Sequence, residues 1–425
     1  MRQWMVAAKK ADFYAIAEKF HVDPVVARII RNREVIGEKN IRIYLGGNLS
    51  DLSDPHQMKD MDRLVEILAQ KIRKQVHIRI IGDYDVDGVT SSHLFLTALR
   101  RVGAKVDVVI PHRIQDGYGL SLHLLQQAKE DGVDTILTCD NGIAAIDEIA
   151  WAKAQKMTVL VTDHHAVPFE EHEGRRTEKK SLADAVVNPH QQDCGYPYKE
   201  LCGAGVAWNV IRVLYENYDM DKREAEDLLD FVAMATVCDV MSLTGENRIL
   251  VKEGLKRIRH TKNIGLQALM QACNVQPENI SAYHFGYVLG PCVNATGRLD
   301  TARHALRLFE TGQETEAEEI ARDLVDLNQE RKELTLQGVE MAKKLCEEGG
   351  YENDPVLVLF LPDVHESIAG LIAGRIREMY NRPVFVLTRG EEGVKGSGRS
   401  TENYSMYENM CGCVELLSLI HISEP

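Results

Sequence analysis

Residues 76–88 read VHIRIIGDYDVDG, a β-rich apolar run that ends in a cluster of aspartates. If the chain stays extended there, the alternate positions of Asp83, Asp85 and Asp87 place all three carboxylates on one face. Carboxylates held that close repel one another unless cations lie between them. An EF-hand-like calcium loop is a poor fit because no Glu stands at its twelfth position. The segment therefore predicts a metal site at the end of a buried strand.

Further acidic and His residues follow later predicted strands. The runs 106–110, 135–139, 158–162 and 185–188 are short and apolar, and predicted helices separate them. Strands that alternate with helices are typical of a mostly parallel α/β sheet, in which ligands bind beyond the carboxyl ends of the strands. The residues found at those ends are Asp140 before Asn141 and Gly142, and Asp163 before His164 and His165.

Each of these later signals is ambiguous alone. Asp-Asn-Gly is a common turn, and two adjacent His residues can sit on a surface loop. Asp239 lies in the apolar run 234–243, where a buried ion pair or a helix cap is the alternative to a metal ligand. Together, five Asp and one or two His favour Mn²⁺ or Mg²⁺ over softer metals. So many anionic ligands indicate two ions, which would activate water and neutralise a phosphoryl group.

Size and composition set the broader limits. A chain of 425 residues predicts two or three domains. Its net charge of −14 argues against a non-specific DNA coat protein but leaves room for a local basic groove. Nine Cys residues without a CxxC pair indicate a reducing compartment, and we see no signal peptide or membrane span. These features predict a cytoplasmic protein.

The pattern of predicted elements suggests domain bounds. Residues 1–75 are expected to form a helical segment, 76–313 the catalytic α/β domain, and 314–350 a charged linker helix. A smaller α/β domain is expected at 351–416. Its end at 395–400 is a basic segment rich in Gly and Ser, and the string GSGRS taken on its own favours a flexible turn.

The motifs GDYDVDG, CDNG and TDHH, with the later Asp239, resemble the four motifs of the DHH phosphoesterase superfamily. Within it, the strings PHRIQDGYGL, VNPH, LCGAGVAW and PCVNATGRLD look like the RecJ branch. VHESIAGLIAGRI and VKGSGRS resemble the associated nucleic-acid-binding domain, called DHHA1. RecJ-like chains normally continue past this point. The tail 417–425 resembles a translated sequencing adapter, so we expect a fragment truncated near Leu416.

The resemblance implies a role for each matching residue. Asp83 and Asp85 would serve one metal ion, and Asp140 would bridge to a second ion held by Asp87, His164 and Asp239. His165 would contact the scissile phosphate or help the leaving oxygen. Asp163 would orient a His. The residues implied in substrate binding are Arg113, Ser397 and Arg399 for a 5′-phosphate, Asn294 and Arg298 for the DNA backbone, and His365.

Several alternatives remain open. Arg298 can equally form a salt bridge to Asp300 or cap a helix, and His365 can serve in capping or packing. Tyr84, Tyr118 and Trp208 can stack on bases, but lone aromatic residues more often belong to a core. The implied activity is 5′→3′ exonucleolytic hydrolysis of single-stranded DNA in repair and recombination, with a helicase or single-strand DNA-binding protein as possible partners. Its rivals are a DHH enzyme acting on oligoribonucleotides, cyclic dinucleotides or pyrophosphate, and a non-catalytic scaffold.

Overall fold

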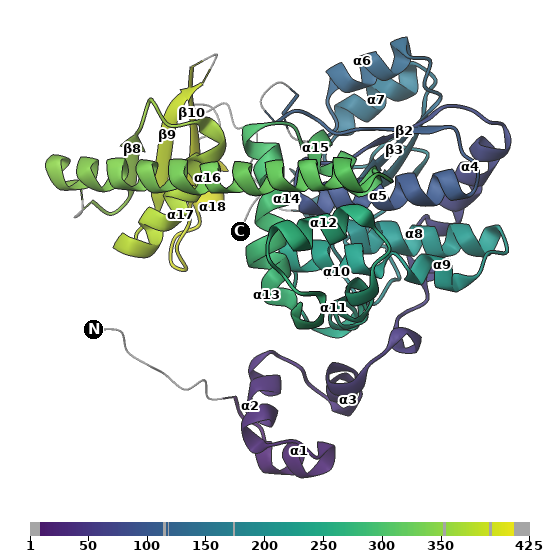
Figure 1. The fold of residues 1–425 in the computed structure, drawn as a ribbon, viewed down its shortest axis with the longest axis horizontal. Helices are drawn as coiled ribbons and strands as arrows, with labels where there is room; N and C mark the ends of the chain where they lie inside the picture. Colours follow the sequence, from purple (N-terminus) through teal and green to yellow (C-terminus); the bar gives the residue numbers. More distant parts are fainter. Residues whose placement is uncertain are drawn as a thin grey trace.

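The computed structural model describes residues 9–113, 116–117, 119–172, 175–351, 354–390 and 393–411. Two expected features, the possible base-stacking residue Tyr118 and the tail 417–425, lie outside the described residues. Figure 1 shows two α/β units joined by one long helix, with a small helical module below them.

A five-stranded parallel sheet forms the first unit. Its order is β2-β1-β3-β4-β7, and every neighbouring pair is parallel. The α/β class with a mostly parallel sheet is thus confirmed. The strands are β1 (Ile78–Ile81), β2 (Val106–Val109), β3 (Thr135–Cys139), β4 (Thr158–Thr162) and β7 (Ala185–Val187).

Helices cover both faces of this sheet, as its fully buried central strands require. On one face, a core that includes Ile136 and Val159 packs against α6 (Leu122–Glu130) and α7 (Ile146–Ala154). On the other face, a larger core includes Ile80, Leu137 and Leu160. The helices that contribute to that core are α4 (Met61–Arg73), α5 (Val86–Arg101) and α8 (Gly203–Asn217). Figure 1 shows α6 and α7 on the opposite side of the strands from α5 and α8.

A helical lobe extends the larger core. Its segments are α9 (Lys222–Glu226), α10 (Leu229–Cys238), α11 (Gly245–Arg257), η3 (Ile258–His260), α12 (Ile264–Ala272), η4 (Pro277–Asn279), α13 (Ala282–His284), the π-helix η5 (Phe285–Leu289), α14 (Gly290–Leu299) and α15 (Ala302–Glu310). The buried faces of α10, α12, α14 and α15 join the core beneath α5. Within the lobe, α10 and α14 both contact α5, the helix that follows β1.

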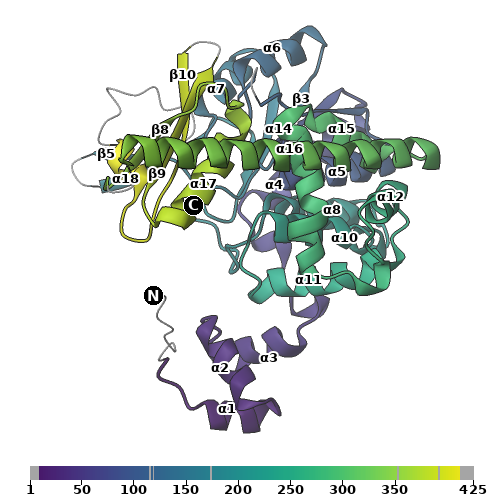
Figure 2. The ribbon, with the colours of Figure 1, turned by 60° about the vertical axis from the view of Figure 1, so that its left-hand side comes forward.

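The second unit begins after α16 (Glu314–Gly349), a 36-residue helix that Figure 2 shows running across both units. The unit has a three-stranded sheet of order β10-β9-β8, where β8 (Leu357–Phe360) is parallel to β9 (Val384–Gly390). β10 (Gly393–Arg399) is antiparallel to β9. A separate core joins α16 to this sheet and to α17 (Ala369–Tyr380), which follows η7 (Glu366–Ile368). The last described helix is α18 (Met406–Cys411).

The N-terminal module has its own small core around Ile30 and Tyr44. It contains α1 (Phe13–Phe20), α2 (Pro24–Asn32) and α3 (Glu38–Gly46), followed by η1 (Leu49–Asp51) and η2 (Pro55–Gln57). Asp12 and Asp23 cap the first two helices by accepting backbone N–H groups. Among the residues described, none of the helices combines the length and apolar character that crossing a bilayer requires.

Three local features differ from what the sequence alone indicates. The helix after the Asp cluster begins within it, at Val86, because the side chain of Asp85 caps it through the N–H of Gly88. The segment 395–400, whose Gly and Ser content alone favours a flexible turn, belongs mostly to β10, because the ladder with β9 overrides that content. The hairpin of β5 (Phe169–His172) and β6 (Arg175–Glu178) was not expected at all.

Candidate metal centre

The carboxyl ends of β1, β3 and β4 meet at one place, and the acidic loops that leave them converge. Three groups of side chains have ligand atoms within 4.8 Å of one another. They are Asp83 with Asp85 and Asp140; Asp87 with His164 and Asp239; and Asp140 with His164 and His165. We call the six residues Asp83, Asp85, Asp87, Asp140, His164 and Asp239 the ligand cluster.

The loop after β1 is not the extended run that its alternating aspartates predicted. Asp83 and Asp85 leave the strand, but Asp87 lies in the first turn of α5. A side-chain Cβ at position 88 would lie 2.5 Å from backbone atoms of Asp83, so only glycine fits there. The carboxylates therefore converge through a tight strand-to-helix turn.

The N-terminus of α8 holds Asp87 in place. The N–H groups of Gly203 and Ala204 donate to its two carboxylate oxygens over 2.6 and 2.8 Å. These N–H groups have no partner within their own helix, and the helix dipole favours an anion there. A Cβ on Gly203 would lie 2.7 Å from Cβ of Asp140. The LCGAG string thus brings a helix end against two members of the ligand cluster, a contact that sequence reasoning did not foresee.

Asp140 sits on a strained and well-anchored loop. Its backbone has φ 60°, which a non-glycine residue rarely adopts. The carboxamide of Asn141 donates to the carbonyls of Ile81 and Cys139, which ties this loop to β1 and β3. Strain of this kind persists where the surroundings fix it, and it is common at functional sites.

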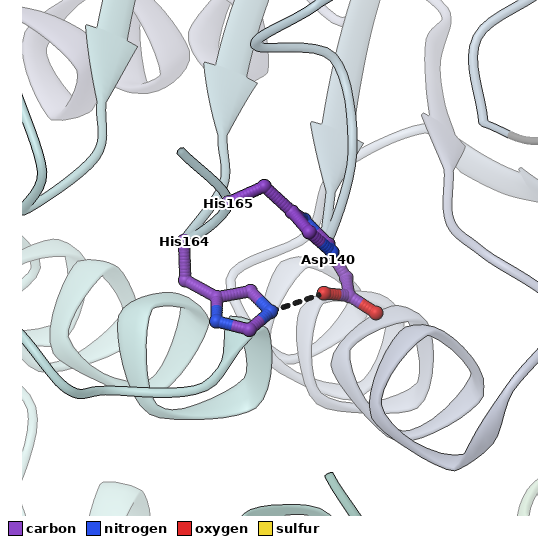
Figure 3. A group of neighbouring side chains, drawn as sticks. All are labelled: Asp140, His164 and His165. Atoms are coloured by element: carbon purple, nitrogen blue, oxygen red, sulfur yellow. Dashed lines mark ion pairs between the residues drawn. The ribbon is translucent and has the colours of Figure 1, made fainter. Parts of the chain in front are cut away.

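His164 lies at the centre of the cluster. Its Nε2 is 3.0 Å from Oδ1 of Asp140 and 3.7 Å from carboxylate oxygens of both Asp87 and Asp239. Figure 3 shows the His164 ring directed at the Asp140 carboxylate. Burial lowers the pKa of His164, which favours the neutral imidazole that can bind a metal.

The electrostatics of the cluster fit a cation. Burial, and then the charge of Asp85, raises the pKa of Asp83 well above its usual range. Burial and the charge of Asp87 raise the pKa of Asp85 to about 6. Oδ1 of Asp83 and Oδ1 of Asp140 are buried without a hydrogen bond, since the approach of His164 to Asp140 lacks hydrogen-bond geometry. Buried acceptors of this kind suit the oxygen ligands that Mn²⁺ and Mg²⁺ prefer.

Asp163 and His165 form a supporting pair. Nδ1 of His165 donates to Oδ1 of Asp163 over 2.8 Å, while Oδ2 accepts the N–H of Ile143. Burial opposes charge on both groups, but the hydrogen bond between them lowers the pKa of Asp163 to about 2 and raises that of His165 to about 9. The His165 carbonyl also accepts from buried Asn188, a positioning contact from the VNPH string that sequence reasoning did not assign.

The residues expected to bind substrate lie in both units. The guanidinium of Arg113 stacks over the ring of Tyr84, 4.8 Å from its centroid. Oδ1 of Asn294 accepts the N–H of Val86 and so supports the Asp loop. Nη1 of Arg298 donates to the carbonyl of Ser367 over 2.7 Å, which joins α14 to the second unit.

The remaining three residues lie in the second unit. Nδ1 of His365 contacts the hydroxyl of Ser367 at 2.6 Å and caps η7, as its alternative reading allowed. Ser397 and Arg399 share β10, and a Cβ on Gly370 of α17 would lie within 2.9 Å of both side chains. Their contact with substrate stays a prediction. Trp208 is 2% exposed and donates to the carbonyl of Ala225, so it belongs to the core.

The fold and the Asp and His loops together define a DHH-type domain, and the family model described as "DHH family, N-terminal domain" matches residues 77–236. The chain belongs to the RecJ family. It is 35% identical over 416 residues to the single-stranded-DNA-specific exonuclease RecJ of Haemophilus influenzae, covering 95% of this chain and 69% of that protein. It is 33% identical to the Bacillus subtilis protein of the same name, of which it spans half the length.

Solved structures agree with this assignment. The crystal structure of an exonuclease RecJ bound to manganese superposes with a TM-score of 0.71 at 32% identity, covering 83% of this chain and 85% of that one. RecJ of Thermus thermophilus in complex with Mn²⁺ gives a TM-score of 0.76 at 29% identity, covering 96% of this chain and 56% of that one.

Proposed function

We propose that this chain is a metal-dependent exonuclease that removes mononucleotides from the 5′ end of single-stranded DNA. The observation that carries this proposal is the ligand cluster, in which five carboxylates and one imidazole from separate loops converge around buried acceptor atoms. The names of its relatives, single-stranded-DNA-specific exonucleases, support the substrate class. The chain spans only part of the length of those relatives, so the activity of the whole protein is itself part of what we propose.

Two sub-sites for divalent cations, Mn²⁺ or Mg²⁺, follow from the grouping of the ligands. Asp83 and Asp85 would hold one ion, and Asp87, His164 and Asp239 the other, with Asp140 between them. When bound, the two cations lower the pKa of a water molecule and neutralise charge on the phosphoryl oxygens. Two relatives whose structures hold manganese support this assignment.

The protein's own residues would orient the reaction. The N–H groups of Gly203 and Ala204 fix the Asp87 carboxylate, so its ligand geometry exists before any ion arrives. His165, protonated through its bond to Asp163, presents a positive charge to the scissile phosphate or a proton to the leaving oxygen. We find no need for a protein nucleophile, because an activated water suffices.

A pocket for the 5′-phosphate would set the polarity of digestion. Arg113, Ser397 and Arg399 would bind that phosphate, since a guanidinium offers a fork of donors to phosphate oxygens. Arg298 and Asn294 would line the path of the backbone, and His365 would stand beside it. Removal of the 5′-phosphate from the substrate should then slow cleavage, whereas removal of a 3′-phosphate should not.

We extend the proposal to the cellular compartment and to partner proteins. Seven described cysteines are free thiols, which suits the reducing cytoplasm. A helicase that supplies single strands, or a single-strand DNA-binding protein, would be the natural partner in repair and recombination. Digestion of end-labelled DNA tests the activity. Cleavage of short oligoribonucleotides, cyclic dinucleotides or pyrophosphate in place of DNA would move the function to the rival enzymes.

A further inference from the structure

Two exposed tyrosines stack on each other in the segment that packs against the end of α10. Tyr283 is 62% exposed and Tyr287 is 72% exposed, yet their ring centroids lie 5.1 Å apart with planes only 24° from parallel. His284 packs edge-on against Tyr283. The rings thus form an ordered pair of flat apolar surfaces that faces solvent.

The segment that carries the tyrosines contacts the residue next to Asp239. Tyr287 lies in the π-helix η5, and π-helical turns occur often at functional sites. Sγ of Cys238 donates to the carbonyl of Phe285 over 3.3 Å, and Asp239 is the next residue after that thiol. A Cβ on Gly290 would lie 2.3 Å from the same sulfur, so η5 and the end of α10 are in close contact.

The residue that follows Asp239 in the chain is also unusual. Val240 follows Asp239 directly, is 88% exposed and has φ 56°. A β-branched residue with positive φ is a genuine outlier, and such strain is typical of sites that contact a ligand. Figure 1 places α13 and α14 at the margin of the helical lobe, toward the unit of β8–β10.

We propose that Tyr283 and Tyr287 form a base-stacking platform for the single-stranded DNA whose backbone enters the metal centre past Asp239. This inference rests on the proposed function. Every base has a flat π-face, so aromatic rings hold a single strand without reading its sequence. A helix α14 that carries Asn294 and Arg298 continues directly from η5, so the platform and the expected backbone contacts share one continuous segment.

Binding without cleavage tests the platform separately from the enzyme. We would measure the anisotropy of a fluorescent, 5′-phosphorylated oligothymidylate of about 12 nucleotides in EDTA, a length within the range that single-strand sites cover. The variants are the double change Tyr283→Ala/Tyr287→Ala and the conservative Tyr283→Phe/Tyr287→Phe. The control is Tyr14→Ala, which removes a tyrosine that is 77% exposed in the distant α1.

The double alanine variant should bind between about 5-fold and about 100-fold more weakly than the control, as loss of one or two stacked bases implies. The phenylalanine variant should bind like the unaltered protein, because stacking needs the ring and not the hydroxyl. 2-Aminopurine placed along the strand should be quenched on binding by the unaltered protein and not by the alanine variant.

Equal affinity of the alanine variant and the Tyr14→Ala control would overturn the platform, and so would an unaltered protein that binds no oligonucleotide. If the alanine variant changed in sedimentation while its DNA affinity stayed the same, the tyrosines would form a contact with a second copy of the chain. That result would also overturn the platform. The proposed function fails on a different result: an unaltered protein that binds the oligonucleotide but does not cleave it when Mn²⁺ is added. Weaker binding by the alanine variant would still support the platform in that case.

Discussion

Nδ1 of His165 donates to Oδ1 of Asp163 over 2.8 Å, and the same oxygen accepts the backbone N–H groups of His164 and His165. One carboxylate, 1% exposed, therefore fixes both the ring of His165 and the backbone of the two adjacent His residues. Partners of this kind matter nearly as much as the groups that they orient.

We expect Asp163→Asn to lower kcat by about 10- to 100-fold, because an amide holds a neutral His165 less firmly. KM for single-stranded DNA should change much less. Steady-state kinetics measure the split, with Asp193→Asn as the control because the Asp193 side chain is 67% exposed. An equal loss in both variants would contradict the orienting role.

Gly203 provides a test of the contact between α8 and the ligand cluster. In Gly203→Ala the new Cβ would fall 2.7 Å from Cβ of Asp140, so Asp87 and Asp140 must move apart. A displacement near 1 Å can lower the rate by about 100-fold. We expect that loss, together with weaker Mn²⁺ binding by calorimetry.

The matched control for this change is Gly205→Ala in the same helix. Its new Cβ would meet Leu201 at 3.4 Å, an ordinary contact. If Gly205→Ala reduced metal affinity as strongly as Gly203→Ala, general disruption of α8 would explain the result.

A substitution at Arg79 tests the stability of the parallel sheet separately from the metal centre. Its guanidinium pairs with both oxygens of Asp107 and with Asp131, and its side chain is 8% exposed. Arg79→Met should lower the free energy of unfolding by about 2 kcal/mol. This is less than for a fully buried pair because both aspartates remain partly solvated. Denaturant unfolding measures the loss, and kcat per folded molecule should not change.

The burial of His93 predicts how the free energy of unfolding depends on pH. Its ring is buried against Phe231 and Phe309, and burial lowers its pKa to about 3. In the unfolded chain the pKa is about 6.5, so below that pH the unfolded state binds a proton that the folded state excludes. The free energy of unfolding should therefore fall as pH falls from about 6.5 toward about 3.

Between pH 7 and pH 5, this group alone should remove about 2 kcal/mol of stability. His93→Leu should abolish that part of the pH dependence, measured by urea unfolding at both values. His260→Gln, a change at an exposed residue, should keep it. An unchanged pH slope in His93→Leu would contradict the assignment.

The catalytic sheet was predictable because its signals are local. Buried apolar strands that end in Asp or His are visible in the sequence, and parallel topology brings their ends together. The geometry of the Asp loop was not predictable, since the capping of α5 by Asp85 turns Asp87 into a helix. The contact of α8 with Asp87 joins residues 116 positions apart, which no local pattern reveals.

In the second unit, by contrast, the local composition of the sequence points to the wrong element. The segment 395–400 has the Gly and Ser content of a turn, yet residues 395–399 pair with β9, and tertiary contacts override propensity. The tyrosine pair also could not be recognised from the sequence, because exposure depends on the fold. Tyr283 and Tyr287 look like helix-spaced core residues until the fold shows that both are exposed.

The proposed exonuclease activity is best tested by digestion of single-stranded DNA labelled at either end, with Mn²⁺, with EDTA and with an Asp87→Ala variant. We predict immediate release of a 5′-labelled mononucleotide with Mn²⁺, and none with EDTA or in the variant. Release that begins at the 3′ end, or that persists in Asp87→Ala, would contradict it.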